Sequence, residues 1–204
     1  MKLSNYFFNL IRSTDGLSPD QIKSNLQAQP RKTFHLVADG FAPSFLSSVL
    51  FFPNAEILFT KKDDFTFEEE KEFIKKHNDN GRRRLLFISR GYSIHDIDTL
   101  LRLKISMFLW DKAGALNRPS DLIKWATAHK GRVFLAATGY TPLVLKLSLR
   151  SPLQVFIRKN DFQLPIIREL TDKGKNRIFI IADDFSQNTL NDLKNRGANI
   201  LRRE

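Results

Sequence analysis

The chain has 204 residues, of which 42% are hydrophobic and 18 are Phe, so one or at most two packed domains are expected and extensive disorder is excluded. The absence of Cys excludes disulfides, thiolate metal sites and thiol catalysis. A net charge of +11 favours anionic ligands or acidic partners.

Residues 1–30 are predicted to form an N-terminal helical cap, with a helix that begins after Ser18. Terminal segments of repeat proteins are usually atypical because they cover an exposed end of the core. The segment lacks the long apolar run of a signal peptide, and no later stretch approaches the ~20 apolar residues of a membrane-spanning helix. We therefore expect a cytoplasmic protein.

Residues 31–204 are predicted to form seven βα repeats followed by a final strand at residues 199–201. Each copy has an apolar strand, a polar turn, an anchor residue that is aromatic in six copies, and a helix. The anchors are Phe41, Phe65, Tyr92, Ala115, Tyr140, Phe162 and Phe185. The core positions seven residues before them are Phe34, Leu58, Leu85, Phe108, Val133, Val155 and Ile178.

The turns and helix starts of the repeats have their own patterns. A Gly or Asp precedes every anchor, and both residues tolerate the backbone angles of tight turns. Four copies have a residue suited to capping a helix directly after the anchor. These caps are Thr66, Ser93, Thr141 and Ser186. In the fifth copy, prolines bracket alternating leucines at residues 142–152, which predicts an extended or irregular connector. The acidic run at residues 68–72 is predicted to be a solvated helix face.

The spacing of apolar and Asn-like residues resembles the LxLxxNxL core of leucine-rich repeats. The segment from Val155 to Phe162, with Asn160 at the Asn position and a helix behind it, is similar to the ribonuclease-inhibitor-like subclass. This resemblance implies an α/β solenoid shaped like a horseshoe, with a parallel sheet on the concave face and helices outside. It also implies function by binding a protein, without catalysis and without a cofactor.

One row of residues departs from that pattern. The position six residues before each anchor is expected to face solvent on the concave side, but it is apolar in six copies. The row consists of His35, Phe59, Leu86, Leu109, Phe134, Phe156 and Phe179. Strands that are apolar on both faces are typical of sheets covered on both sides. The solenoid either offers this strip to a partner or to its own N-terminal segment, or the strands close into a compact (β/α)8 barrel. An open doubly wound sheet is the third alternative.

The solenoid interpretation predicts a non-catalytic scaffold that binds a partner protein, with an acidic surface, on its concave sheet. Basic residues are spread along the chain, which does not favour nucleic acid. The predicted binding residues are Phe59, Lys61, Lys62, Leu86, Ser89, Leu109, Asp111, Lys112, Phe134, Phe156, Arg158, Lys159 and Phe179. No histidines have metal-ligand spacing and no glycine-rich nucleotide loop is present, so no metal or cofactor is predicted.

The barrel interpretation predicts a small enzyme acting on a phosphorylated or otherwise anionic substrate. Its functional residues would follow the strands and meet at one end of the barrel. Candidates for this position are Asp39, Arg90, Asp111, Thr138, Arg158 and Asp183. The candidate residues for a phosphate-binding site are Lys61, Lys62, Lys112, Arg158 and Lys159. Alternatively, these acids only form turns and these bases a solvated rim.

Overall fold

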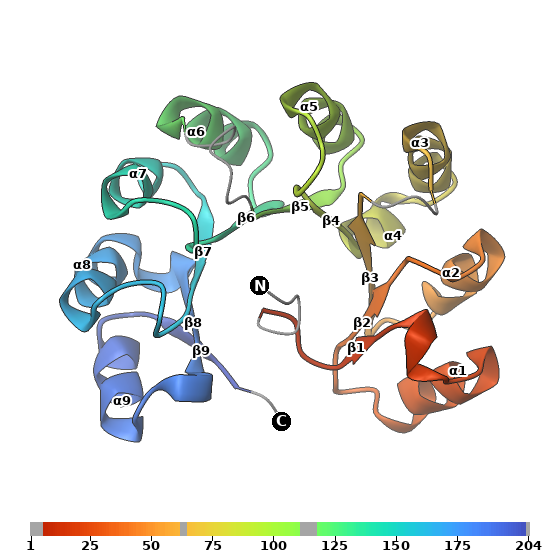
Figure 1. The fold of residues 1–204 in the computed structure, drawn as a ribbon, viewed down its shortest axis with the longest axis horizontal. Helices are drawn as coiled ribbons and strands as arrows, with labels where there is room; N and C mark the ends of the chain where they lie inside the picture. The colour runs from red at the N-terminus through yellow and green to blue at the C-terminus, as the bar shows by residue number, and fades with distance from the viewer. Residues whose placement is uncertain (1–5, 62–64, 111–117, 203–204) are drawn as a thin grey trace. The chain divides into compact units, whose positions relative to one another are not determined.

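The computed structural model describes residues 6–61, 65–110 and 118–202, in which helices alternate with parallel strands (Figure 1). The predicted α/β class is therefore correct. The chain divides into two compact units, residues 1–107 (unit 1) and 108–204 (unit 2), with strand β5 (Ser106–Leu109) at the boundary. In the described part of the chain, every helix is too short or too polar to cross a membrane.

Unit 1 is a parallel sheet with helices on one side (Figure 1). Its elements are β1 (Leu10–Ile11), η2 (Ser13–Asp15), α1 (Pro19–Ala28), β2 (Phe34–Val37), α2 (Pro43–Val49), β3 (Ala55–Thr60), α3 (Phe67–Lys75), α4 (Asp79–Arg83), β4 (Leu85–Ile88) and α5 (Ile94–Arg102). Strands β1 to β4 pair in chain order, and all the pairs are parallel. Residues 1–30, the predicted cap, thus include both helix α1 and strand β1.

The helix side of unit 1 is a hydrophobic core. Phe34 and Leu36 of β2 pack there with Ile22 of α1 and Val49 of α2. Ser18 caps α1 as predicted, because its hydroxyl accepts a hydrogen bond from the N–H of Gln21, and the N–H of Ser18 donates one in return to Oε1 of the Gln21 side chain. The alternation of side chains along a strand therefore directs His35 to the opposite side of the sheet.

The N-terminal segment lies against His35. The ring nitrogen Nδ1 of His35 is 2.7 Å from the carbonyl oxygen of Phe8, and its ring centre is 5.2 Å from that of Phe7. The other ring nitrogen is 3.2 Å from a carboxylate oxygen of Glu56. Tyr6 and Phe7 are both buried. In unit 1, part of the face without helices is thus covered by the chain's own N-terminal segment.

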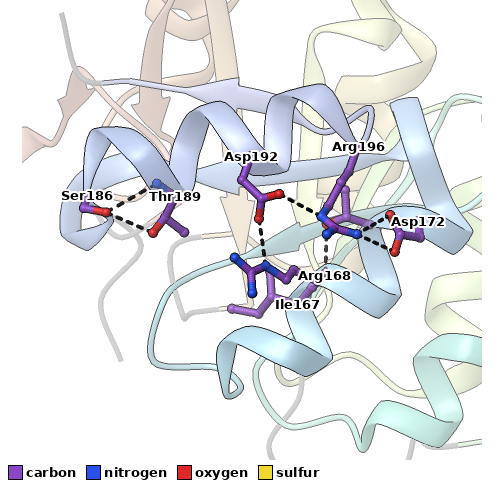
Figure 2. A network of polar contacts seen from close by, with 8 residues as sticks. Ile167, Arg168, Asp172, Ser186, Thr189, Asp192 and Arg196 are labelled. Atoms are coloured by element: carbon purple, nitrogen blue, oxygen red, sulfur yellow. Dashed lines mark hydrogen bonds and ion pairs between the residues drawn. The ribbon is translucent and has the colours of Figure 1, made fainter.

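Unit 2 repeats the same organisation. Its elements are α6 (Pro119–Ala128), β6 (Val133–Ala136), α7 (Pro142–Ser148), β7 (Gln154–Ile157), α8 (Leu164–Gly174), η3 (Lys175–Arg177), β8 (Ile178–Ile181), η4 (Ala182–Asp184), α9 (Gln187–Asn195) and β9 (Asn199–Leu201). Strands β6 to β9 pair in chain order and are parallel. Arg196, directly after α9, binds both carboxylate oxygens of Asp172 in α8, at 2.8 and 3.0 Å, and also binds Asp192 (Figure 2).

The helix starts follow the repeat. All four predicted caps accept a hydrogen bond from the third residue of the helix that follows. The copy with Ala115 as its anchor differs, because α6 begins at Pro119, four residues after the anchor, and Arg118 at the cap position forms no side-chain capping hydrogen bond. The connector predicted to be irregular is helix α7. The prediction was wrong because Pro142 occupies the first helical position, where no hydrogen bond from its nitrogen is needed.

Strand β3 is out of phase with the predicted repeat by one residue. Ile57 pairs with Leu85. Ile57 lies eight residues before its anchor, Phe65, whereas Leu85 lies seven residues before its anchor, Tyr92. Phe59 therefore points to the helix side, where its ring stacks on Phe87 at 4.6 Å and meets Phe73 of α3 at 5.6 Å. Because side chains alternate along a strand, one extra residue moves every side chain to the other face. The prediction that Phe59 faces outward is wrong.

Candidate functional site

Helix α3 places one acidic side chain inside unit 1. Thr66 caps the helix by accepting a hydrogen bond from the N–H of Glu69, whose carboxylate binds the N–H of Thr66 in return. The helix that follows buries Glu70 together with Phe73, because residues three apart share a helix face. Glu70 is only 2% exposed. The prediction that the acidic run is a solvated face is therefore wrong at Glu70.

Tyr92, the anchor before α5, is the partner of Glu70. The turn after β4 positions it: the N–H of Tyr92 donates to the carbonyl of Ser89 at 3.0 Å, and Gly91 adopts a φ of +91°, which glycine accepts without strain. The Tyr92 hydroxyl donates a hydrogen bond to Oε1 of Glu70. The other carboxylate oxygen, Oε2, is buried and has no hydrogen-bond partner among the described residues.

Burial is the main influence on the ionisation of this pair. It raises the pKa of Glu70 to about 7, against the Tyr92 hydrogen bond and the positive charge of Lys61, which lower it. Burial and the neighbouring Glu70 raise the pKa of Tyr92 well above its ordinary value. Near neutral pH, Glu70 is thus populated as both acid and carboxylate, while Tyr92 remains a hydrogen-bond donor.

Lys61 supplies a positive charge beside this pair. Its Nζ lies 3.4 Å from Oδ2 of Asp96 and 5.4 Å from the centre of the Tyr92 ring, and its side chain is 45% exposed. Burial acts to raise the pKa of Asp96, but hydrogen bonds from Ser93 and the charge of Lys61 bring it below its usual value. Asp96 is therefore a carboxylate at neutral pH and holds Lys61 across the ring of Tyr92.

Two further polar side chains complete the cluster at the ends of β2 and β3. Thr60, the last residue of β3, donates a hydrogen bond of 3.1 Å to Oδ2 of Asp39, which lies two residues beyond β2. Strands β2, β3 and β4 are parallel neighbours, so their carboxyl ends share one edge of the sheet. Ligands of α/β proteins commonly bind at this edge. The Glu70 site consists of Asp39, Thr60, Lys61, Glu70, Tyr92 and Asp96.

No protein-family model and no curated protein sequence matches the chain. Among solved structures, the chain is similar to the crystal structure of thiamine phosphate pyrophosphorylase from Bacteroides thetaiotaomicron. The TM-score is 0.43 and the sequence identity 13%, over 84% of this chain and 82% of that one. At these values the similarity carries no argument about the function of this chain.

A second carboxyl group, Asp161 in unit 2, has a different environment. Its Oδ1 accepts a hydrogen bond from the Thr138 hydroxyl, and its Oδ2 accepts one of 2.8 Å from the N–H of Arg158. Burial raises the pKa of Asp161, and these two hydrogen bonds oppose the rise. Both oxygens are therefore occupied, and Asp161 stabilises the turn after β7. Only Glu70 combines a raised pKa with an unpartnered oxygen among the described carboxylates.

The predicted binding residues fall into three groups. Those that are buried are Phe59, Leu86, Ser89 and Leu109. The half-buried or exposed ones are Lys61, Phe134, Phe156, Arg158, Lys159 and Phe179. Outside the described residues are Lys62, Asp111 and Lys112. The predicted solvent exposure is wrong for the first group because these side chains are packed, while a binding role for the second group stays a prediction.

Strand β5 also departs from the predicted phase. The ring of Phe108, predicted as core, is 5.5 Å from the ring of Phe156, which was predicted to face outward. Phe108 thus joins the row that Leu109 was expected to occupy. The anchor of this copy is not aromatic, and the helix behind it starts late. Counting residues back from Ala115 therefore assigned the side chains of β5 to the wrong faces of the sheet.

The residues predicted for the enzyme alternative are distributed over both units. Asp39 and Lys61 belong to the Glu70 site, whereas Thr138 and Arg158 belong to the Asp161 turn. Arg90 and Asp183 are exposed. Their convergence in a closed barrel stays a prediction. Within the described ranges, no group of three His, Asp or Glu side chains could hold a metal ion.

The two central residues of the site are not evident from sequence patterns alone. Tyr92 was interpreted only as an anchor, and Glu70 only as part of a charged run. One signal was available for Glu70: it lies three and four residues before Phe73 and Ile74, on the apolar side of α3. A carboxyl group on the buried side of an amphipathic helix requires a partner, since an unpaired buried charge is unstable.

Proposed function

We propose that this protein is an enzyme that acts on a phosphorylated or otherwise anionic substrate by general acid–base catalysis, with Glu70 as the group that transfers the proton. The observation that supports the proposal is a buried carboxyl group with a pKa of about 7 and one oxygen without a partner among the described residues. Perturbed carboxyl groups of this kind are found preferentially at functional sites.

Each side chain has a separate role in this proposal. A base with a pKa near the working pH can take a proton and return it, so Glu70 would exchange the proton at Oε2. Tyr92 keeps the other oxygen, Oε1, in a fixed hydrogen bond. Lys61 would bind the substrate anion in place of Asp96, and its movement would uncover the ring of Tyr92 and then Glu70.

Proton-linked binding tests the proposal directly. An anion bound at Lys61 disfavours the Glu70 carboxylate, so binding at pH 7 is expected to take up a fraction of a proton. We would measure the binding of inorganic phosphate and of pyrophosphate by isothermal titration calorimetry. Two buffers of different ionisation enthalpy reveal the number of protons taken up on binding. Glu70→Gln is expected to bind without proton uptake, and Lys61→Met is expected to lose binding. Lys104→Met, which removes an exposed lysine paired with Asp79, is the matched control.

Turnover is measured on a panel of sugar phosphates and organic acids, followed by phosphorus and proton NMR in deuterated water. We expect one class of these compounds to be converted or to incorporate deuterium, and Glu70→Gln to abolish the change. Equal proton uptake by wild type and Glu70→Gln, or turnover that survives the substitution, would refute the role of Glu70. The protein-binding scaffold implied by the repeat remains a separate prediction.

A further inference from the structure

The face of unit 2 opposite the helices contains a row of aromatic rings. Phe108, Phe134, Phe156 and Phe179, the phenylalanine row, lie on β5, β6, β7 and β8. The ring of Phe156 contacts the other three: it is edge-on to Phe108 at 5.5 Å and to Phe134 at 6.1 Å, and nearly parallel to Phe179 at 4.9 Å. The row is thus continuous across neighbouring strands.

Burial shows that three of these rings remain accessible. Along β7, Val155 and Ile157 are buried, and Phe156 between them is half-buried, as expected for a strand with one packed and one open side. Phe134 and Phe179 have the same intermediate exposure between buried neighbours. A row of partly accessible phenylalanines is unusual on a solvated sheet and indicates a surface that binds a partner.

The basic residues are spread over both units, but most of the positive net charge lies in unit 2 because this unit has few acidic residues. Residues 108–204 contain 17 of the 33 Lys and Arg residues but only 9 of the 22 Asp and Glu residues, which assigns a net charge of +8 out of +11 to unit 2. Arg158 and the exposed Lys159 follow β7 directly, two and three residues after Phe156. Positive side chains therefore border the carboxyl end of the phenylalanine row.

The row leads into a hollow at the last strand of the unit. This cavity of about 630 Å³ is lined by Phe179 from the row, by the amide side chains of Asn191 and Asn199, and by the cations Lys194 and Arg202. The guanidinium of Arg202 is held there by Gln187 at 3.0 Å. An aromatic ring, hydrogen-bonding amides and two positive charges thus line one space.

We propose that unit 2 binds single-stranded nucleic acid along the phenylalanine row. Unpaired bases stack on exposed aromatic rings, while Lys and Arg neutralise the phosphates that connect them. The cavity beside Phe179 would take one end of the nucleic acid, where Lys194 and Arg202 can neutralise a phosphate. A run of Asp and Glu side chains would satisfy the positive charge but offers no aromatic faces that stack on the rings. This inference does not depend on the Glu70 site, which lies in unit 1.

Fluorescence anisotropy with labelled oligo-dT and oligo-U tests the proposal. The oligonucleotides have about 12 nucleotides, which is within the ~4–16 nucleotides that one binding fold covers. Polyglutamate of similar length is the control for a general acidic ligand. A duplex of the same length is the second control, because its bases are paired and cannot stack on the rings. The proposal expects binding of the single strands, with weaker binding of both controls. Phosphate contacts at Lys159, Lys194 and Arg202 predict a slope of about −2 for log K against log salt.

Matched variants separate stacking from charge. Phe156→Leu keeps an apolar side chain but removes the ring, and is expected to weaken binding about tenfold. Phe162→Leu, at a half-buried Phe outside the row, is its control. Lys159→Gln is expected to lower the salt slope, whereas Lys173→Gln on α8 is not. Circular dichroism verifies that each variant is folded.

Three outcomes would overturn the proposal. One is binding of polyglutamate as tight as that of the oligonucleotides, which would indicate an acidic protein partner. Another is unchanged oligonucleotide binding by the folded Phe156→Leu variant, which would show that the rings do not stack on bases. The third is failure to bind either oligonucleotide.

Discussion

Replacing Glu70 by Gln is expected to change how the stability of the protein depends on pH. In the unfolded chain the Glu70 carboxyl group has its ordinary pKa of 4.5, and in the folded protein the pKa is about 7. Between these values the folded protein binds more protons than the unfolded one. The free energy of unfolding therefore falls as pH rises through this window. Below pH 4.5, where Glu70 is neutral in both states, this loss is absent.

The size of the effect follows from the shift in pKa. One pKa unit corresponds to 1.36 kcal/mol, so a carboxyl group shifted from 4.5 to about 7 lowers stability by about 2–3 kcal/mol at pH 8, after allowance for partial solvent screening. Glu70→Gln is neutral at every pH. The free energy of unfolding of the variant, relative to that of wild type, should therefore rise by about 2–3 kcal/mol between pH 4 and pH 8. A constant difference caused by the amide itself does not affect this change with pH.

Urea denaturation followed by circular dichroism at pH 4, 5, 6, 7 and 8 measures this difference. Glu72→Gln is the matched control, because Glu72 lies on the exposed side of the same helix and the hydrogen bond from Lys75 lowers its pKa. This control should not show the gain at high pH. Parallel stability curves for wild type and Glu70→Gln would refute the reasoning, since they would mean that Glu70 titrates alike in both states.

Three further predictions concern single side chains. Tyr92→Phe removes a hydrogen bond that lowers the pKa of Glu70, so carbon-13 NMR should show this pKa above about 7; an unchanged pKa would contradict the pairing. Phe59→Ala should lower the free energy of unfolding by about 3–5 kcal/mol and Phe134→Ala by less, because only Phe59 is fully buried; equal losses would contradict the assigned faces. Ser18→Ala should cost about 1 kcal/mol and Ser18→Asp much less, as measured by thermal unfolding, because only Asp keeps a cap for α1; similar losses would exclude capping.

Most of the local structure follows from sequence patterns, with helix α7 and strand β1 as exceptions. The caps at Thr66, Ser93, Thr141 and Ser186 were identified because a cap and the N–H group that it binds are three residues apart. The strands were identified because their apolar residues are contiguous. The parallel α/β class follows from these two patterns, since a strand followed by a helix returns the chain to the same edge.

Which face of a strand each side chain occupies depends on tertiary contacts. Phe59 and Phe108 were assigned from their distance to an anchor, and one additional residue in the connection reverses that assignment. Sequence periodicity defines the alternation of a strand, but its absolute phase depends on pairing with a neighbour that lies more than 20 residues away.

The Glu70 site required the tertiary structure for the same reason. Glu70 and Tyr92 are 22 residues apart and belong to different repeats, so no local pattern connects them. The sequence gives each residue a plausible local role, as part of a charged helix or as an aromatic anchor. Their hydrogen bond and the raised pKa of Glu70 arise only when α3 packs beside the turn after β4, because burial and its electrostatic effect depend on distant neighbours.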